Sequence, residues 1–274
     1  MRIALYQMTS GIDPMGNADM LCSAMKDAAK QGACMLFAPE MSGMIDRDRA
    51  RAARHIRHEA DNPFIATAQK AAAEYAIWIH LGSLPVLDDT GVGAGKWRNR
   101  SLVIDNFGII QARYDKIHLF DVDLPTGESW RESSAYAPGE AAVIVQTPLG
   151  AMGLTICYDL RFSSLFNALA GSGARVIVVP SAFTVPTGQA HWHILLRARA
   201  IEQGCFIIAA AQCGTHADGR QTYGHSLVVD PWGTIIFDAG INAALSIIDI
   251  DLSMVDEVRS RLPVLQHQRA FAAP

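Results

Sequence analysis

One cysteine in this chain stands in a setting that could support nucleophilic chemistry. Cys157 ends a strongly apolar run and is followed by a phenol, a carboxylate and a guanidinium in the sequence TICYDLR. A predicted strand ends there and a predicted helix follows, so the positive end of the helix dipole would favour the thiolate. This stretch alone leaves two interpretations open: a small apolar side chain at the edge of a core, or a nucleophile.

Two charged residues follow the cysteine in the same stretch. We expect Asp159 to cap the helix that follows, because aspartate oxygens accept hydrogen bonds from the first amide groups of a helix. Arg161 then falls in the first helical turn. A guanidinium placed there could bind a substrate anion through two parallel hydrogen bonds.

Three further charged residues stand in settings that allow chemistry. Glu40 ends the run MLFAPE, at the carboxyl end of a predicted strand, where open α/β sheets place their sites. Lys116, between apolar residues in RYDKIHLF, could lower a thiol pKa or stabilise an oxyanion. Glu132 lies in the polar, loop-like segment ESWRESSAYAPGE, which also holds Glu128. Each also has an ordinary interpretation: a solvated acid, a snorkelling lysine, or a partner for Arg131.

The histidines are the rival bases, and a Cys–His dyad is the alternative that would use them. His191 and His193, two positions apart, could suggest a metal, but alternate positions on a predicted helix point to different faces. No carboxylate or third histidine lies at ligand spacing from this pair, so we expect neither a metal nor a cofactor. The candidate bases are His118, His191, His193 and His225.

Composition narrows the class of protein. The chain has 274 residues, 50% of them hydrophobic and 18% charged, with a net charge of −4. A low charged fraction implies a large core, as in a layered fold or an oligomer. There is no basic block, so nucleic acid is not an expected partner, and no apolar run reaches the ~20 residues that span a bilayer. The N-terminal residues lack the features of a signal peptide, so no membrane association is expected.

The five cysteines are scattered singly along the chain. None forms a CxxC pair, so neither a disulfide framework nor a structural zinc site is expected. We expect Cys34, Cys205 and Cys213 in the core and Cys22 on the first helix. A reducing cytoplasm is the expected location.

The elements that must position these residues alternate along the chain. Runs rich in valine and isoleucine predict strands, and segments at helical spacing separate many of them. The stretches LVIDNFGII and LVVDPWGTII predict two similar hairpins that turn at Asp-x-x-Gly. This mixture favours an α/β fold with mixed sheets. The predicted strands are 3–7, 34–38, 76–81, 101–105, 142–147, 152–157, 176–179, 206–211, 227–229 and 245–250, and the predicted helices are 17–31, 62–75, 159–170 and 189–203.

Four motifs taken in order resemble the carbon–nitrogen hydrolase (nitrilase) superfamily. They are APE with Glu40, RYDKIHLFDVDLP with Lys116, ESWRESSAYAPGE with Glu132 and TICYDLRF with Cys157. The resemblance runs from the first strand to about residue 251. Within the superfamily, HLFDVDLP, CYDLRF and PTGQAHW are most similar to the Nit branch, although the pair at 163–164 is Ser-Ser where that branch often has Pro-Glu.

The resemblance implies a fold and a set of catalytic roles. The fold is a four-layer α-β-β-α sandwich with mixed sheets that dimerises through helices. We therefore expect one carbon–nitrogen hydrolase domain over residues 1–274, with a C-terminal tail from about residue 253. In the mechanism it implies, Cys157 attacks the amide carbon and Glu40 carries protons. Lys116 and the backbone N–H of Tyr158 stabilise the oxyanion, while Glu132 positions the lysine.

The same resemblance implies a substrate class. The Nit branch comprises amidases that act on ω-amides of keto-dicarboxylates or on deaminated glutathione. Arg161 matches the branch position that holds a substrate carboxylate, and Thr187 in PTGQAHW is a second candidate for that pocket. We thus expect a cofactor-free amidase that forms a thioester with small carboxylate-bearing amides and releases ammonia or an amine.

Two alternatives remain at this stage. An aliphatic amidase, a nitrilase or an N-carbamoyl amino acid hydrolase would use the same Glu-Lys-Glu-Cys set on another electrophile. A dimeric binding or scaffold protein would use the fold without catalysis. In each case we expect a homodimer or a higher homo-oligomer.

Overall fold

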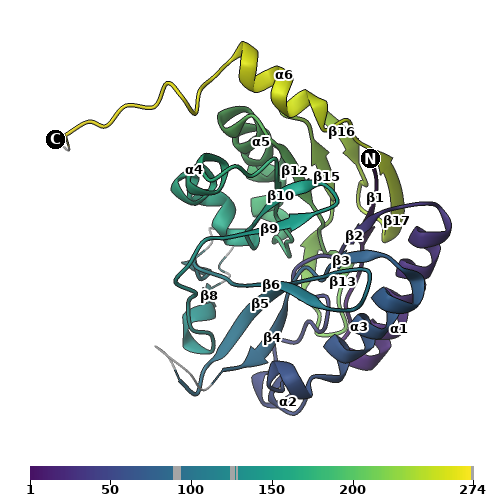
Figure 1. The fold of residues 1–274 in the computed structure, drawn as a ribbon. Helices are drawn as coiled ribbons and strands as arrows, with labels where there is room; N and C mark the ends of the chain where they lie inside the picture. The colour runs from purple at the N-terminus through teal and green to yellow at the C-terminus, as the bar shows by residue number, and fades with distance from the viewer. Residues whose placement is uncertain (89–93, 124–126, 128, 273–274) are drawn as a thin grey trace.

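Two mixed sheets form the centre of the molecule (Figure 1). The computed structural model describes residues 1–88, 94–123, 127 and 129–272; Leu124 and Pro125 of the HLFDVDLP motif, and Glu128, lie outside this set. The first sheet has seven strands, namely β1 (Arg2–Gln7), β2 (Met35–Phe37), β3 (Trp78–His80), β4 (Leu84–Leu87), β5 (Trp97–Ile104), β6 (Ile110–Asp115) and β17 (Ala244–Asp249). Its order is β17-β1-β2-β3-β5-β4, with β6 paired to β5.

The second sheet has six strands in the order β16-β15-β12-β11-β10-β9. They are β9 (Val143–Thr147), β10 (Gly150–Leu154), β11 (Val176–Val178), β12 (Phe206–Ala209), β15 (Leu227–Val229) and β16 (Ile235–Asp238). In each sheet three neighbouring strands run parallel: β1, β2 and β3 in the first, and β10, β11 and β12 in the second. The flanking strands are antiparallel, so the expectation of mixed sheets is confirmed.

The helices form the outer layers. In Figure 1 the purple and blue helices α1 (Pro14–Lys30) and α3 (Pro63–Tyr75) lie outside the first sheet, and the green helices α4 (Ser163–Gly171) and α5 (Val185–Gln203) lie outside the second. One buried cluster joins the facing sides of the two sheets, for example Leu5 and Phe37 with Ile177 and Ile207. A second cluster fills the space between the first sheet and its helices. The expected α-β-β-α layering is therefore observed.

Short elements connect and extend these layers. Two small antiparallel pairs are β7 (Asp121–Asp123) with β8 (Ser129–Arg131), and β13 (Cys213–Thr215) with β14 (Gln221–Tyr223). The remaining helix near the first sheet is α2 (Arg49–Ala53), and the 3₁₀ helices are η1 (Glu59–Asp61), η2 (Glu132–Ser134) and η3 (Cys157–Arg161). The segment expected as a tail begins with α6 (Ser253–Arg261), whose Val255 and Val258 are buried. Among the residues that the structure describes, no helix combines the length and apolar composition that a bilayer crossing requires.

Local sequence explains where several elements start and turn. The Asn62 side chain accepts hydrogen bonds from the first amides of α3, and Pro63 occupies its first position, as an N-terminus favours. Both predicted Asp-x-x-Gly hairpins are present, as β5–β6 and β15–β16. In each, the aspartate accepts two backbone N–H groups of the turn: Asp105 in the first and Asp230 in the second.

The predicted helix 159–170 is not continuous in the structure. The segment 159–170 was expected to be continuous, but it is divided into η3 and α4, with Phe162 between them. The predicted strand 152–157 also ends early, at Leu154. Cys157 therefore begins a five-residue 3₁₀ helix, and the α-helix starts only at Ser163.

Any side chain at position 82 should destabilise the fold. The φ of Gly82 is +69°, and an added Cβ would overlap the carbonyl oxygen of Pro39. We expect Gly82→Ala to lower the free energy of unfolding by about 3 kcal/mol or more, since overpacking adds to left-handed strain. Gly95→Ala is the matched control, because Gly95 has φ +86° and open space around it. It should cost only the strain, about 1–2 kcal/mol. Equal losses in urea unfolding would contradict this account.

Candidate active site

Four of the residues singled out in the sequence meet in one buried site. Glu40 follows β2, Lys116 follows β6, Glu132 begins η2 and Cys157 begins η3. The Lys116 Nζ lies 2.9 Å from Glu40 Oε1 and 2.9 Å from Glu132 Oε2. Cys157 lines the same cavity as Glu40, Lys116 and Glu132, and the charge of Glu40 acts on its thiol pKa. Ends of strands from both sheets thus bring a thiol, an ammonium and two carboxylates together.

Glu40 is fixed by donors on three sides. Asn99 Nδ2 donates to its Oε1 at 2.9 Å, and the Ala182 N–H donates to its Oε2 at 2.9 Å. Gln212 Nε2 donates to its backbone carbonyl at 3.0 Å. These contacts leave the carboxylate little freedom to rotate, so its orientation toward the thiol and the lysine is set before a ligand enters.

Glu132 and Lys116 are fixed in a similar way. The Phe120 N–H donates to Glu132 Oε2 at 2.7 Å, and Asn99 Nδ2 lies 3.4 Å from Glu132 Oε1. Burial alone would lower the pKa of Lys116, but the negative charges of Glu132 and Glu40 outweigh it and raise the pKa well above the usual value. The lysine is therefore a charged ammonium.

The expected thiolate is not supported. Burial is the largest influence on Cys157 and raises its pKa well above the usual value; the charge of Glu40 raises it further, and Lys116 lowers it. An α-helix beginning at the cysteine would have favoured the thiolate, but only the short η3 begins there. In the resting site the sulfur is a neutral thiol beside a carboxylate that can take its proton.

The backbone at Cys157 is strained. Its φ is +48°, in the left-handed region that non-glycine residues seldom occupy. Its N–H donates to the Pro180 carbonyl at 2.9 Å, which holds the turn in place. This sharp turn between a strand and a 3₁₀ helix points the thiol into the site, as in a nucleophile elbow.

Asp159 caps a helix as predicted, but the helix is the short η3 and not an α-helix: as its third residue it accepts the N–H of Ile156, the residue that precedes η3. Its Oδ2 accepts the Ile156 N–H at 2.8 Å and the Tyr114 hydroxyl at 2.6 Å. Its Oδ1 accepts the His118 N–H at 3.0 Å and lies 2.7 Å from the ring nitrogen Nδ1. This fully buried carboxylate ties the cysteine turn to the strand that leads to Lys116, and so serves the position of the site.

A cavity of about 270 Å³ opens above the four residues. Arg161 lines it, with the guanidinium 5.9 Å from the centre of the Tyr158 ring and 5.8 Å from that of Phe183. Its Nη2 lies 3.2 Å from His191 Nδ1. Thr187, in the first turn of α5, also lines the cavity. The two predicted substrate-binding side chains, Arg161 and Thr187, therefore line the same cavity as the four predicted catalytic residues.

Sequence reasoning missed several residues of this site. Asn99, which bonds both carboxylates, lies within a strand and belongs to no motif that marks it. Ala182 contributes through its backbone, which no side-chain pattern reveals. Arg220 lines the far wall, 4.7 Å from the centre of the Trp130 ring. Only proximity in the folded chain identifies these contributors.

The histidines do not supply a catalytic base. Among the residues that the structure describes, no histidine lines the cavity. His118 is bound to Asp159 and stacks on Phe162 with ring centres 3.6 Å apart. His193 and His225 both face Asp238 on another part of the molecule. The Cys–His alternative is therefore wrong, because the group beside the thiol is a carboxylate.

Comparison with known proteins shows the family to which the chain belongs. The family model for carbon–nitrogen hydrolases matches residues 2–260. The chain belongs to the carbon–nitrogen hydrolase family. This carbon–nitrogen hydrolase is 40% identical over 268 residues to a deaminated glutathione amidase of Yersinia enterocolitica, a match that covers 97% of this chain and 92% of the relative.

Two solved structures extend the comparison. The NitFhit protein of C. elegans superimposes with a TM-score of 0.88 at 38% identity, over 98% of this chain and 65% of that one. A mutant amidase of Nesterenkonia sp. AN1, at 27% identity, superimposes with a TM-score of 0.81 over 98% of this chain and 94% of that one. That structure shows the acetamide moiety of fluoroacetamide covalently added to its active-site cysteine. The protein is therefore an enzyme that hydrolyses carbon–nitrogen bonds.

The opposing influences on the Cys157 pKa predict opposite effects of two substitutions. Glu40→Gln removes a charge that raises the thiol pKa, so the pH midpoint for alkylation of Cys157 should move down. Lys116→Met removes the ammonium that lowers it, so the midpoint should move up. The rate of iodoacetamide labelling of the Cys157 peptide, followed by mass spectrometry at several pH values up to about 10, measures both shifts: below the midpoint the rate follows the thiolate fraction, so it should be higher in Glu40→Gln and lower in Lys116→Met than in wild type. Cys22 in the same samples should keep its midpoint; shifts of the same sign at Cys157 would contradict the account.

Proposed function

We propose that the protein is a cysteine-dependent amidase of small carboxylate-bearing amides, with a thioester intermediate. One observation carries the proposal: the thiol of Cys157, the carboxylate of Glu40 and the ammonium of Lys116 share a cavity with the guanidinium of Arg161. The thiol, base and cation suit acyl transfer, and the guanidinium suits a carboxylate on the substrate. The amidase names of the relatives support the same class.

In the proposed first step, Cys157 Sγ attacks the amide carbon while Glu40 takes the thiol proton. Negative charge develops on the carbonyl oxygen, where Lys116 Nζ and the backbone N–H of Tyr158 stabilise it; one such donor contributes about 10²–10³-fold to the rate. The carbon–nitrogen bond then breaks as Glu40 gives its proton to the leaving nitrogen. The products of this step are a thioester on Cys157 and free ammonia or amine.

The proposed second step releases the acid. Glu40, again a carboxylate, takes a proton from water as the water oxygen attacks the thioester carbon. The carbon–sulfur bond breaks, the sulfur recovers a proton from Glu40, and the carboxylic acid leaves. The protons return to their starting positions, and no cofactor enters the balance.

Glu132 has a positioning role in this scheme. Both of its oxygens lie within 3.1 Å of Lys116 Nζ, and the Phe120 N–H fixes it from the other side. Its charge keeps the lysine protonated, and its geometry keeps the ammonium beside Glu40. We assign it to the lysine and not to the substrate.

Arg161 and Thr187 are proposed to select the substrate. The guanidinium lies between two aromatic rings, with part of its fork facing the cavity that Cys157 lines. A carboxylate held there would orient the amide carbon toward the sulfur, whereas a plain aliphatic amide or nitrile would lack this contact. Deaminated glutathione and ω-amides of keto-dicarboxylates carry such a carboxylate. N-carbamoyl amino acids do as well, and remain the second candidate class.

We also propose a homodimer built on α5 and the β15–β16 hairpin. Exposed apolar side chains gather on these two elements, and the Gly233 turn lies directly against Ile201. A patch of this kind favours burial against a partner. The patch comprises Ile194, Ile201, Trp232 and Ile236.

We further propose a single domain and a cytoplasmic location. The buried cluster that both sheets share supports the single domain. The five free thiols support a reducing, cytoplasmic location.

Substitution of the proposed nucleophile tests catalysis. We expect Cys157→Ala to lower the rate of ammonia release from succinamate by at least ~10³-fold, because no other group can form the thioester. Cys22→Ala, which changes a thiol outside the cavity, should retain full activity. Mass spectrometry of the quenched wild type should find an acyl adduct on Cys157. Equal rates in wild type and Cys157→Ala would overturn the nucleophile, and no turnover of any substrate in wild type would favour a binding protein.

Removal of the guanidinium tests selectivity. We expect Arg161→Ala to lower kcat/KM for succinamate by about 10–100-fold, since a charged hydrogen bond contributes roughly 1.5–3 kcal/mol. The value for butyramide, which lacks the carboxylate, should stay the same. Arg161→Lys should recover part of the loss, and Arg54→Ala on the exposed α2 side should have no effect. An unchanged ratio between the two substrates would remove Arg161 from its role.

A further inference from the structure

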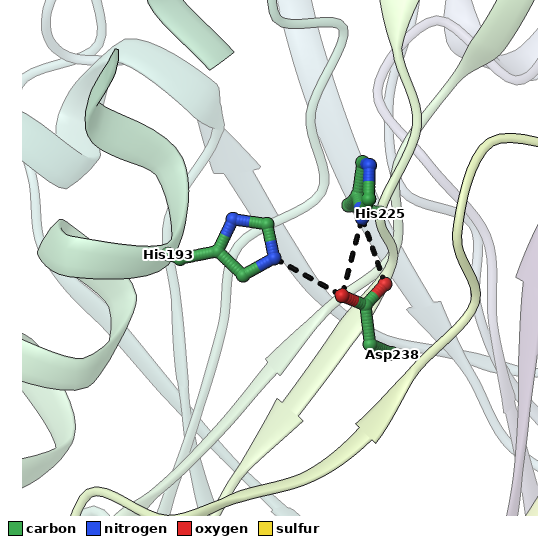
Figure 2. A group of neighbouring side chains, drawn as sticks. All are labelled: His193, His225 and Asp238. Carbon is green, nitrogen blue, oxygen red and sulfur yellow. Dashed lines mark hydrogen bonds and ion pairs between the residues drawn. The ribbon is translucent and has the colours of Figure 1, made fainter. Parts of the chain in front are cut away.

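Away from the catalytic cavity, two histidines and an aspartate point at one another (Figure 2). His193 projects from the middle of α5, His225 stands just before β15, and Asp238 ends β16. His193 Nε2 lies 3.1 Å from Asp238 Oδ2. His225 Nδ1 lies 3.0 Å from Oδ1 and 3.1 Å from Oδ2 of the same carboxylate. None of the three takes part in the proposed reaction.

We propose that His193, His225 and Asp238 form a binding site for a divalent transition cation of the zinc class. Two imidazole nitrogens and one carboxylate oxygen are a donor set that Zn²⁺ prefers, with a fourth position for water. The three ligand atoms all lie within 4.8 Å of one another. Bonds of ~2.0–2.2 Å in a tetrahedron separate ligand atoms by about 3.4 Å, so the rings need to move by only about an ångström.

The surroundings hold these ligands ready. The Gly240 N–H donates to Asp238 Oδ1 at 2.8 Å, which fixes the carboxylate. The backbone of His225 is held by two bonds: Trp192 Nε1 donates to its carbonyl at 2.7 Å, and its own N–H donates to the Gly240 carbonyl at 2.6 Å. The Tyr223 ring stacks on the His225 imidazole with centres 4.5 Å apart. Supporting contacts of this kind orient metal ligands and raise affinity.

In the single protomer the cluster is also open enough for a cation to enter. The side chains of His193, His225 and Asp238 are 30%, 22% and 34% exposed. In the structure each imidazole nitrogen that faces the carboxylate serves as a donor; on metal binding its proton moves to the other ring nitrogen or to solvent. The free lone pair then faces the cation, and the carboxylate exchanges two hydrogen bonds for one metal bond.

A bound cation would connect the helix α5, which reaches the catalytic cavity, to a neighbouring hairpin. It would join α5, whose first turn carries Thr187, to the β15–β16 hairpin. Figure 2 shows the helix and the strands on opposite sides of the cluster. The cation would therefore stabilise the folded state and restrain the helix that lines the substrate side of the cavity.

Equilibrium dialysis with Zn²⁺ tests the site. Wild type treated with a chelator should bind one more equivalent of Zn²⁺ than His193→Gln or Asp238→Asn. His191→Gln is the matched control, since His191 lies on the same helix but outside the cluster, and it should keep the wild-type stoichiometry. Zinc held by thiols appears equally in all four proteins and cancels in the comparison. Circular dichroism establishes that each variant is folded.

Two further measurements separate a formed site from loose association. Co²⁺ should give a visible d–d band in wild type that is lost in His193→Gln. Saturating Zn²⁺ should raise the unfolding temperature of wild type by several degrees and leave that of His193→Gln unchanged. Equal zinc stoichiometry in wild type and both cluster variants, or an equal thermal shift in all of them, would overturn the proposal. Neither readout depends on amidase activity.

Discussion

A buried ammonium between two carboxylates is the interaction on which the site depends. Lys116 is 3% exposed, and its Nζ lies within 2.9 Å of both Glu40 and Glu132. A lone charge at that depth would cost several kcal/mol, so each member requires the others. The lysine has two anions, and the group as a whole carries one excess negative charge. Nearby dipoles offset that excess: the Asn99 amide and the backbone N–H groups of Ala182 and Phe120.

The fold serves this constraint by bringing strand ends together. Glu40 and Lys116 leave the first sheet, whereas Cys157 and Ala182 leave the second. The two sheets face each other across one apolar cluster, and this packing fixes the position of one sheet relative to the other. The buried Asp159 adds a polar link between them, since it holds the Tyr114 hydroxyl of one sheet and the Ile156 N–H beyond the other. The buried charged residues keep their positions because well-packed strands support them from both sheets.

The sequence predicted the parts that depend on local pattern. Valine- and isoleucine-rich runs marked most core strands, and Asp-x-x-Gly marked both hairpins. The order of motifs brought Glu40, Lys116, Glu132 and Cys157 into one hypothesis before any geometry was known. Contacts between distant segments were beyond it. Asn99 and Ala182 reach Glu40 across 59 and 142 positions, and Asp238 reaches His193 across 45. The same limit applies to Asp159: its capping bond to Ile156 is local, whereas its bonds to Tyr114 and His118 join distant segments and were not predicted.

The expectation that Cys157 rests as a thiolate was wrong, and the reason bears on how charge would move within the site. A thiolate at rest would add a second excess negative charge to a buried group that already has one. The raised pKa of Cys157 avoids this, and the Glu40 charge that raises it also supplies the acceptor for the proton. In the proposed attack, the proton passes to Glu40 as negative charge forms on the carbonyl oxygen near Lys116. The total charge of the buried group stays constant throughout, so no step has to create a new charge away from water. A neutral thiol beside a fixed carboxylate is thus better suited to this enclosed site than a standing thiolate would be.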